Sequence, residues 1–488
     1  MKRTARLGLL MTLTAVAASF VTACQTSSAS AVQWSTCQGT GLDPRQECAT
    51  ISVPLDYEKL DGEQISIAIS RLRSQHPESR HGVLLLVPGG PGGSGLDLPS
   101  TDGAELPSVV RDTYDLIGFD PRGLGASTPA NCRIAKDDLV LERLRGWPDA
   151  AGSISSNIPR QQRIADNCVK NGGDLVRSIS TRTEARDIDR IREALGEQKI
   201  SAWGESYGTY VLSVYSTLFA DRTDRILVDS NDDPNPDYVQ RNWMAIYSVG
   251  AEDRFPDFAR WASTPDNPDR VADTPEAVRS EFLTLAARLD RDPLSWPGAD
   301  LSSLSGNGLR QLMLDSLYSD KSFPYLAQVI NAADRSTTLP AARPGPPEAI
   351  AQPLTAVLVA TLCNDVAWPT SIPDYAAAVT ENRAHYPLTA GMPKTVPPCA
   401  FWPYQPVPRT VVDSHGPSNI LLIQNLRDPA TPYSGALKLR EAFGTRARMV
   451  SVDAGGHGAY PSPSTCANAA VETFLLDGTR PAEDITCR

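Results

Sequence analysis

Lys199-Ile-Ser-Ala-Trp-Gly-Glu-Ser-Tyr-Gly-Thr-Tyr-Val-Leu212 is the stretch that decides the fold of this chain. A short apolar run enters the pattern Gly204-Glu-Ser-Tyr-Gly208, and an apolar, helix-compatible run follows it. A strand, a sharp turn and a helix in this order hold the central serine at the carboxyl edge of a sheet, over the amino end of a helix. The stretch therefore predicts that Ser206 is a nucleophile, although Gly-x-Ser-x-Gly alone also occurs at ordinary strand–helix turns.

Further apolar runs on both sides of this stretch predict an α/β sheet. Residues 48–57 and 64–72 alternate polar and apolar side chains, which indicates an antiparallel hairpin that turns through Asp61-Gly62. Later strands alternate with helical patterns such as residues 181–195, and this alternation is typical of a mostly parallel sheet. Besides the run before Ser206, the predicted strands of this sheet are residues 82–87, 114–119, 225–229, 419–424 and 448–452.

The strand pattern stops for a long central segment. Residues 231–410 are rich in Pro, Asp, Trp and Ala and contain helix-like pieces but no run that indicates a buried strand. We therefore expect a large, mainly helical cap inserted after the sixth predicted strand. The sheet domain would then consist of residues 45–230 and 411–488.

The amino-terminal segment predicts export. Basic residues precede an apolar stretch, which is the layout of a secretory signal in residues 1–23. The stretch ends in Val21-Thr-Ala-Cys24, which resembles a bacterial lipobox, and the resemblance implies that Cys24 is lipidated. We expect an extracytoplasmic protein, anchored to the membrane through Cys24 or secreted, with residues 24–44 as a tether. An ordinary cleaved signal that carries a cysteine is the alternative.

The cysteine count agrees with export. Removing Cys24 from the nine cysteines leaves eight, and an even set in an exported protein indicates disulfides. The sequence leaves many pairings open, and the simplest joins neighbours along the chain. No pair has the C-x-x-C spacing of zinc or redox motifs, and we expect no metal or other cofactor. The simplest pairs are Cys37–Cys48, Cys132–Cys168, Cys363–Cys399 and Cys466–Cys487.

Composition indicates a folded protein with no preference for nucleic acid. The 488 residues are 41% hydrophobic and 21% charged, so the chain can bury a large core. The formal net charge is −11, which does not favour binding to a polyanion. We therefore expect no nucleic-acid partner.

A serine nucleophile needs a histidine base and an acid that orients it. Of five histidines, only His457 follows a predicted strand at the same edge as Ser206. Asp428 follows the preceding strand, and Asp229 is its rival because it also ends a strand. We prefer Asp428 over Asp229 and over Asp453, which lies only four residues before the histidine. The chain order Ser206, Asp428, His457 is the order expected of α/β-hydrolases.

Two backbone N–H groups must stabilise the oxyanion. One is expected from Tyr207, directly after the nucleophile. The other is expected from the loop Pro88-Gly-Gly-Pro-Gly-Gly93, where glycines let the backbone approach the substrate carbonyl. Gly90 is the predicted donor. The loop lacks the Gly-Lys-Ser/Thr ending of a phosphate-binding loop.

Several motifs together support a family resemblance. Pro88-Gly-Gly-Pro-Gly92 resembles the His-Gly-Gly-Pro-Gly loop of proline iminopeptidases. Gly204-Glu-Ser-Tyr-Gly-Thr209, Asp428-Pro-Ala-Thr-Pro432 and Gly455-Gly-His457 resemble the tripeptidyl aminopeptidase branch, as does Thr361-Leu-Cys-Asn-Asp365 in the cap. The resemblance implies an α/β-hydrolase fold and an exopeptidase that removes short peptides or single residues from a free amino terminus. Pro88 departs from the histidine of the iminopeptidase loop, which leaves the substrate length open.

An aminopeptidase must bind an ammonium group, and we expect carboxylates near Ser206 to do so. The chosen candidates are Asp365, Asp232 and Glu205; Asp233, Glu252 and Asp253 are weaker ones. Each of them could instead be a solvated or structural acid.

Three other functions remain open. Gly-Glu-Ser-Tyr also occurs in serine carboxypeptidases, where the glutamate helps to bind a substrate carboxylate. A carboxylesterase would use the same three catalytic residues. A surface lipoprotein that binds peptides without cleaving them is the non-enzymatic alternative.

Overall fold

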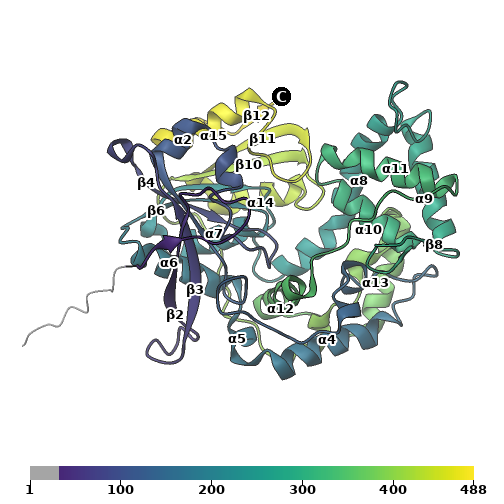
Figure 1. Cartoon of the computed structure of the whole chain (residues 1–488), viewed down its shortest axis with the longest axis horizontal. Helices are drawn as coiled ribbons and strands as arrows, with labels where there is room; N and C mark the ends of the chain where they lie inside the picture. The colour runs from purple at the N-terminus through teal and green to yellow at the C-terminus, as the bar shows by residue number, and fades with distance from the viewer. Residues whose placement is uncertain (1–31) are drawn as a thin grey trace, which may run out of the picture. The chain divides into compact units, whose positions relative to one another are not determined.

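The computed structural model describes residues 32–488, which are built around one ten-stranded sheet (Figure 1). Its strand order is β1-β2-β3-β5-β4-β6-β7-β10-β11-β12. The strands from β5 to β12 run parallel, while β1, β2 and β3 join antiparallel. The strands are β1 Ser35–Thr36, β2 Glu47–Pro54, β3 Gln64–Leu72, β4 Gly82–Val87, β5 Tyr114–Phe119, β6 Ile200–Glu205, β7 Thr223–Asp229, β10 Ile420–Arg427, β11 Ala447–Gly455 and β12 Ile485–Cys487.

Helices cover both faces of this sheet, as its buried parallel strands require. The predicted hairpin is confirmed, since β2 and β3 pair with Ile51 opposite Ile67. One apolar layer joins the sheet to α6, α7 and α14, and the other joins it to α2 and α15. These helices are α2 Ser108–Thr113, α6 Thr181–Ala194, α7 Tyr207–Leu218, α14 Tyr433–Phe443 and α15 Thr465–Asp477.

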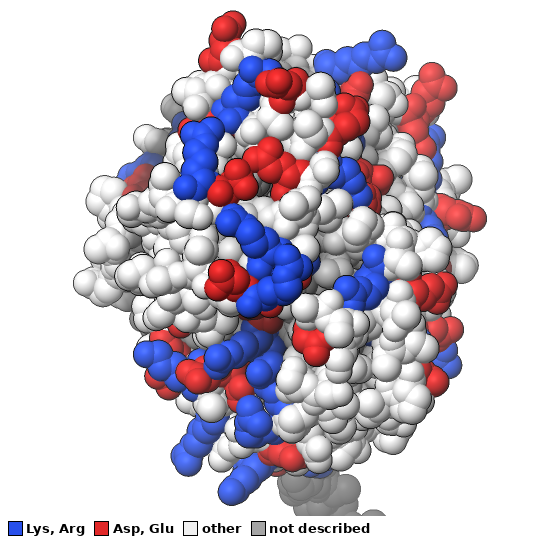
Figure 2. Space-filling model, turned by 90° about the vertical axis from the view of Figure 1, so that its right-hand side faces the viewer, with Lys and Arg blue, Asp and Glu red and all other residues white. Residues whose placement is uncertain are grey.

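The helical insertion follows β7, with a hydrophobic core of its own. The sixth predicted strand is β7 because the two-residue β1 was not predicted. Between β7 and β10 lie α8 Val239–Ala262, α9 Pro275–Leu289, β8 Leu294–Ser295, β9 Ser303–Leu304, α10 Gly306–Ser316, α11 Phe323–Asp334, α12 Glu348–Asp365 and α13 Ile372–His385. Figure 2 shows acidic and basic side chains mixed on the face that carries these helices.

An earlier part of the chain packs against this insertion. Helix α3 (Leu141–Leu144) contacts α10, and α4 (Asn157–Asn171) contacts the short helical turn Pro398–Phe401. Trp147, just after α3, is buried in the core of the insertion. Sequence analysis did not predict this association. The remaining helices are α1 Asp102–Glu105 and α5 Gly173–Ser178.

All four neighbouring cysteine pairs are bonded as predicted: Cys37–Cys48, Cys132–Cys168, Cys363–Cys399 and Cys466–Cys487. The predicted signal sequence and Cys24 lie outside the described residues. Within the predicted tether, Ser35–Thr36 pair with β2 and Cys37 is disulfide-bonded. Among residues 32–488, none of the helices combines the length and apolar character of a membrane span.

Candidate active site

Ser206 occupies the sharp turn between β6 and α7. Its backbone has φ 59° and ψ −127°, a strained conformation for a residue other than glycine. The flanking glycines permit the turn, since a Cβ on Gly204 would lie 2.7 Å from the carbonyl oxygen of Gly208. A Cβ on Gly208 would lie 2.5 Å from the carbonyl oxygen of Val87. Because β6 and α7 approach each other closely at these glycines, the turn holds the Ser206 side chain at the carboxyl edge of the sheet.

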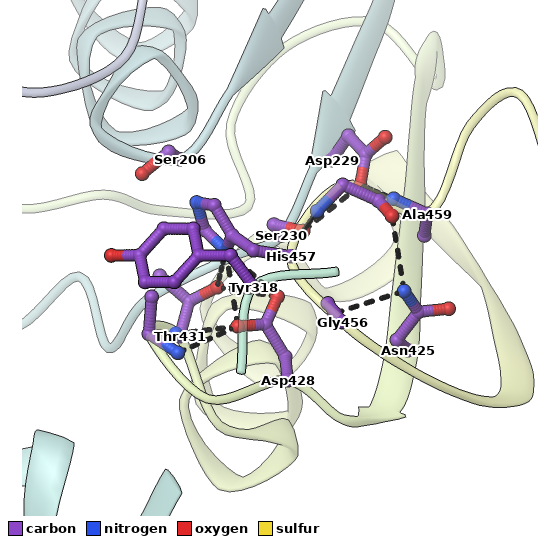
Figure 3. Close-up of polar contacts among 12 residues, drawn as sticks. Ser206, Asp229, Ser230, Tyr318, Asn425, Asp428, Thr431, Gly456, His457 and Ala459 are labelled. Atoms are coloured by element: carbon purple, nitrogen blue, oxygen red, sulfur yellow. Dashed lines mark hydrogen bonds and ion pairs between the residues drawn. The ribbon is translucent and has the colours of Figure 1, made fainter. Parts of the chain in front are cut away.

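His457 and Asp428 meet at the same edge (Figure 3). Asp428 directly follows β10 and His457 lies two residues after β11. The imidazole Nδ1 is 3.0 Å from each carboxylate oxygen of Asp428. Asp428 also accepts hydrogen bonds from the N–H groups of Ala430 and Thr431 and from the Thr431 hydroxyl. These donors hold a fully buried carboxylate in place against the imidazole.

The electrostatics favour the charged imidazole. Burial lowers the pKa of His457, but the carboxylates of Asp428, Glu205 and Asp229 together outweigh burial, so the pKa rises to about 9. Asp229, the rival acid, does not bond to His457. It accepts a hydrogen bond from the N–H of Ala459 (Figure 3) and another from the N–H of Tyr460, and so supports the loop that carries the histidine. Burial raises the pKa of Asp229 to about 8.

Ser206 and His457 line one cavity of about 460 Å³, large enough for a small ligand. In Figure 3 the imidazole lies between Ser206 and Asp428. Within the described part of the chain, the Ser206 hydroxyl makes no hydrogen bond to the His457 imidazole. Such contacts often tighten only when substrate binds. The arrangement has the components of a serine nucleophile, a base and an orienting acid.

The glycine loop after β4 lies beside the nucleophile. A Cβ on Gly89 would lie 3.0 Å from Ser206 Cβ, and Gly90 has φ 121°. The Gly90 N–H has no hydrogen-bond partner in the described part of the chain. The Tyr207 N–H is the first of α7 and has no acceptor within the helix. Both predicted oxyanion donors are therefore free to bind a substrate oxygen.

The three candidate carboxylates are placed differently. Asp365 does not line the cavity. Its carboxylate oxygens instead accept hydrogen bonds from the Thr181 N–H and hydroxyl and from the Gln240 side-chain amide. This carboxylate ties α12 to α6 and α8, so the expectation that it binds substrate does not fit its position. Burial raises the pKa of Asp365 to about 6.

Asp232 and Glu205 lie nearer to Ser206. Asp232 is buried beside a hollow of about 10 Å³ that Ser206 also lines, which leaves no room for a peptide group. Burial raises the pKa of Asp232 to about 7. Glu205 lines the large cavity, and burial raises its pKa while His457 lowers it. Among residues that line this cavity in the described chain, Glu205 alone carries a carboxylate.

Comparison with known proteins places this geometry in a family. Residues 386–487 match the family described as TAP-like protein. The chain is 32% identical over 469 residues to the tripeptidyl aminopeptidase of Streptomyces lividans, covering 93% of this chain and 86% of that protein. This chain belongs to the tripeptidyl aminopeptidase-like family of α/β-hydrolases. It is a serine hydrolase.

Proteins that are less similar to this chain carry other names. The serine protease Hip1 of Mycobacterium tuberculosis (strain ATCC 25618 / H37Rv) is 26% identical over 93% of this chain and 91% of its own length. A Mycobacterium tuberculosis (strain CDC 1551 / Oshkosh) relative named carboxylesterase B is 28% identical, over 93% of this chain and 89% of its own length. Peptidases and an esterase are thus both similar to this hydrolase.

The cavity also contains side chains that sequence analysis missed. Arg145, Tyr247 and Tyr318 line it. The Tyr318 carbonyl accepts the N–H of His457 (2.9 Å), and its ring packs edge-on against the imidazole with centroids 5.0 Å apart. Tyr318 comes from the insertion, so the cap contributes directly to the position of the histidine. No local sequence pattern indicates these contacts, which join segments far apart in the chain.

Proposed function

We propose that this serine hydrolase is an extracytoplasmic exopeptidase that releases short peptides, tripeptides foremost, from free amino termini. The observation that carries the proposal is the convergence of Ser206, His457 and Asp428 at one edge of the sheet, beneath the cap. Similarity to a tripeptidyl aminopeptidase over most of the chain supports the choice of peptide substrates. Release of single residues is the close variant of the same activity.

In the proposed mechanism, His457 Nε2 removes the proton of Ser206, whose oxygen attacks the scissile carbonyl carbon. Asp428 accepts the Nδ1 proton in a hydrogen bond, which fixes the tautomer and stabilises the imidazolium. The N–H groups of Gly90 and Tyr207 bind the oxyanion. His457 then protonates the leaving amine, the acyl-enzyme forms, and a water molecule activated by His457 releases the peptide.

Glu205 is the proposed partner of the substrate's ammonium group. Of the three candidate carboxylates Asp365, Asp232 and Glu205, only Glu205 lines the 460 Å³ cavity that contains Ser206. An ammonium group bound beside this carboxylate favours its charged form and lowers its raised pKa. We therefore assign the amino-terminal side of the peptide to the Glu205 side of the cavity.

The test uses a mixed peptide library with free and with N-acetylated amino termini, followed by mass spectrometry of the products. We expect tripeptides from free termini and strongly reduced cleavage after acetylation. Ser206→Ala should lower activity by roughly a thousandfold or more. Cleavage that ignores acetylation, or a Ser206→Ala protein that keeps over about a tenth of the activity, would contradict the proposal.

Carboxylesterase activity is the second candidate, favoured by the similarity to a protein of that name. Rapid hydrolysis of simple esters with no peptide cleavage would support it. Products cut from the carboxyl terminus would instead indicate a serine carboxypeptidase. Peptide binding without any hydrolysis would indicate a non-enzymatic lipoprotein.

The proposed location is the outside of the cell membrane, with a lipid anchor on Cys24. The basic and apolar start of the chain supports it, as do four disulfides, which are typical of oxidising compartments. Detergent phase partitioning should place the protein in the detergent phase, and Cys24→Ser should move it to the aqueous phase. Equal partitioning of both proteins would contradict the anchor.

A further inference from the structure

The cavity that holds Ser206 contains an arginine that the proposed mechanism does not use. Apart from His457, its charged lining residues in the described chain are Glu205 and Arg145. Arg145 immediately follows α3, and its backbone N–H donates to the carbonyl of Leu141. Helix α3 packs against α10 of the insertion, so the base of this side chain is fixed.

The Arg145 guanidinium has no carboxylate partner. No carboxylate oxygen lies within ion-pair distance of it in residues 32–488, and its Nη1 is buried without a hydrogen-bond partner. Burial lowers the pKa of Arg145, but the Tyr247 hydroxyl beside it and the Asp315 carboxylate outweigh burial and raise it, although Asp315 forms no ion pair with the guanidinium. By contrast, Arg143, two residues earlier, pairs with Asp137 at 3.0 Å. A part-buried guanidinium that lines a cavity without an ion-pair partner can bind an anionic group of a ligand.

Aromatic contacts position the guanidinium along the cavity wall. Its central carbon lies 4.9 Å from the centroid of the Tyr247 ring. The Tyr247 hydroxyl is 2.9 Å from that of Tyr318, whose ring packs against His457. A row of side chains therefore connects Arg145 with the catalytic imidazole, and all its members line the cavity.

We propose that Arg145 is a subsite for a carboxylate group of the peptide substrate. The planar guanidinium matches a carboxylate with two parallel hydrogen bonds, and here it is part-buried and oriented by the Tyr247 ring. The carboxylate belongs either to an acidic side chain or to the free carboxyl terminus of a short peptide. This inference rests on the proposed peptidase function and extends it to the choice of peptide.

The experiment measures kcat/KM for matched peptides. One pair differs only in a carboxyl-terminal acid or carboxamide. A second set has Glu or Gln at each position in turn, with an amidated terminus. In the unmodified enzyme we expect a preference for the acid of roughly tenfold or more in one of the two arms. The arm that shows it identifies the source of the carboxylate.

Variants then connect the preference to the arginine. Arg145→Met should reduce the ratio of acid to neutral peptide to about one, while Arg145→Lys should retain part of it. Arg143→Gln, in helix α3 just before Arg145 but paired with Asp137, is the matched control and should keep the full ratio. Labelling of Ser206 by a fluorophosphonate and thermal unfolding establish that each variant is folded.

Two outcomes would overturn the inference: no preference for either acid in the unmodified enzyme, or a preference that persists in full in Arg145→Met. Both differ from failure of the proposed function, in which none of the peptides is cleaved. In that case, calorimetric titration of Ser206→Ala with the same peptides still decides the question. Tighter binding of the acid member supports the subsite, and equal binding overturns it.

Discussion

At the scale of single residues, His457 combines burial with a buried carboxylate partner. Burial lowers its pKa, but Asp428, Glu205 and Asp229 raise it, and the pKa reaches about 9. The imidazole must be neutral to remove the Ser206 proton. Because the pKa is raised on folding, the interaction stabilises the fold fully below about pH 6.5 and this contribution is lost as pH rises through about 9.

The pH dependence of activity follows from the same shift. In the free enzyme, kcat/KM should increase with pH up to about 9, as His457 loses its proton. Asp428→Asn should move this limb to lower pH, because the nearest of the negative charges that oppose the effect of burial is removed. It should also lower kcat by roughly a thousandfold or more, because the tautomer is no longer fixed. A limb that stays in place in Asp428→Asn would mean that another group sets it.

At the scale of elements, the loop between β11 and α15 is held from two sides. Asp229, at the end of β7, accepts hydrogen bonds from the backbone N–H groups of Ala459 and Tyr460. From the insertion, the Tyr318 carbonyl accepts the N–H of His457. The position of the base therefore depends on a neighbouring strand of the sheet and on the cap.

Asp229→Ala tests the support from β7. Two buried N–H groups lose their acceptor, which should lower the free energy of unfolding by about 1–3 kcal/mol. Because the histidine loop loosens, kcat should fall more than KM rises. Urea unfolding and steady-state kinetics measure both effects. Asp224→Ala, at the opposite, part-exposed end of β7, is the control for kcat, because Asp224 contacts His81 and Ser201 rather than the histidine loop. Unchanged kcat in a destabilised Asp229→Ala would leave Asp229 a purely structural role.

The Cys363–Cys399 disulfide is expected to hold one wall of the cavity in place. It links α12 with the turn Pro398–Phe401, and Leu362 and Pro398 beside it line the cavity. Replacing both cysteines with alanine should lower the free energy of unfolding by about 2–4 kcal/mol. It should also raise KM for peptides, because the wall is no longer fixed. The Cys37–Cys48 pair, next to β1, is the control: its removal should leave KM unchanged.

At the scale of the whole molecule, much of the sheet follows from local patterns. The alternation in β2 and β3 fixes their pairing, and continuous apolar runs identify the parallel strands. Because parallel strands end at one edge of a sheet, the sequence alone predicts that Ser206, Asp428 and His457 lie together. The disulfide pairs were predicted on a different ground: cysteines that are neighbours along the chain are the simplest partners.

Other features depend on contacts between distant segments and have no local pattern. The packing of α3 and α4 against the insertion brings Arg145 into the cavity, and Tyr318 reaches His457 only through the folded cap. The sequence also does not show which way a side chain points. Asp365 was expected to face the substrate, but it accepts hydrogen bonds from Thr181 and Gln240. A sequence shows that a carboxylate is present, and the packing decides what it faces.

The most direct measurement for the whole account is covalent labelling by a fluorophosphonate, with the modified residue located by mass spectrometry. We expect one adduct, on Ser206, formed in parallel with loss of peptide hydrolysis and greatly slowed in His457→Ala. An adduct on another residue, or full loss of hydrolysis while Ser206 remains unmodified, would contradict the account.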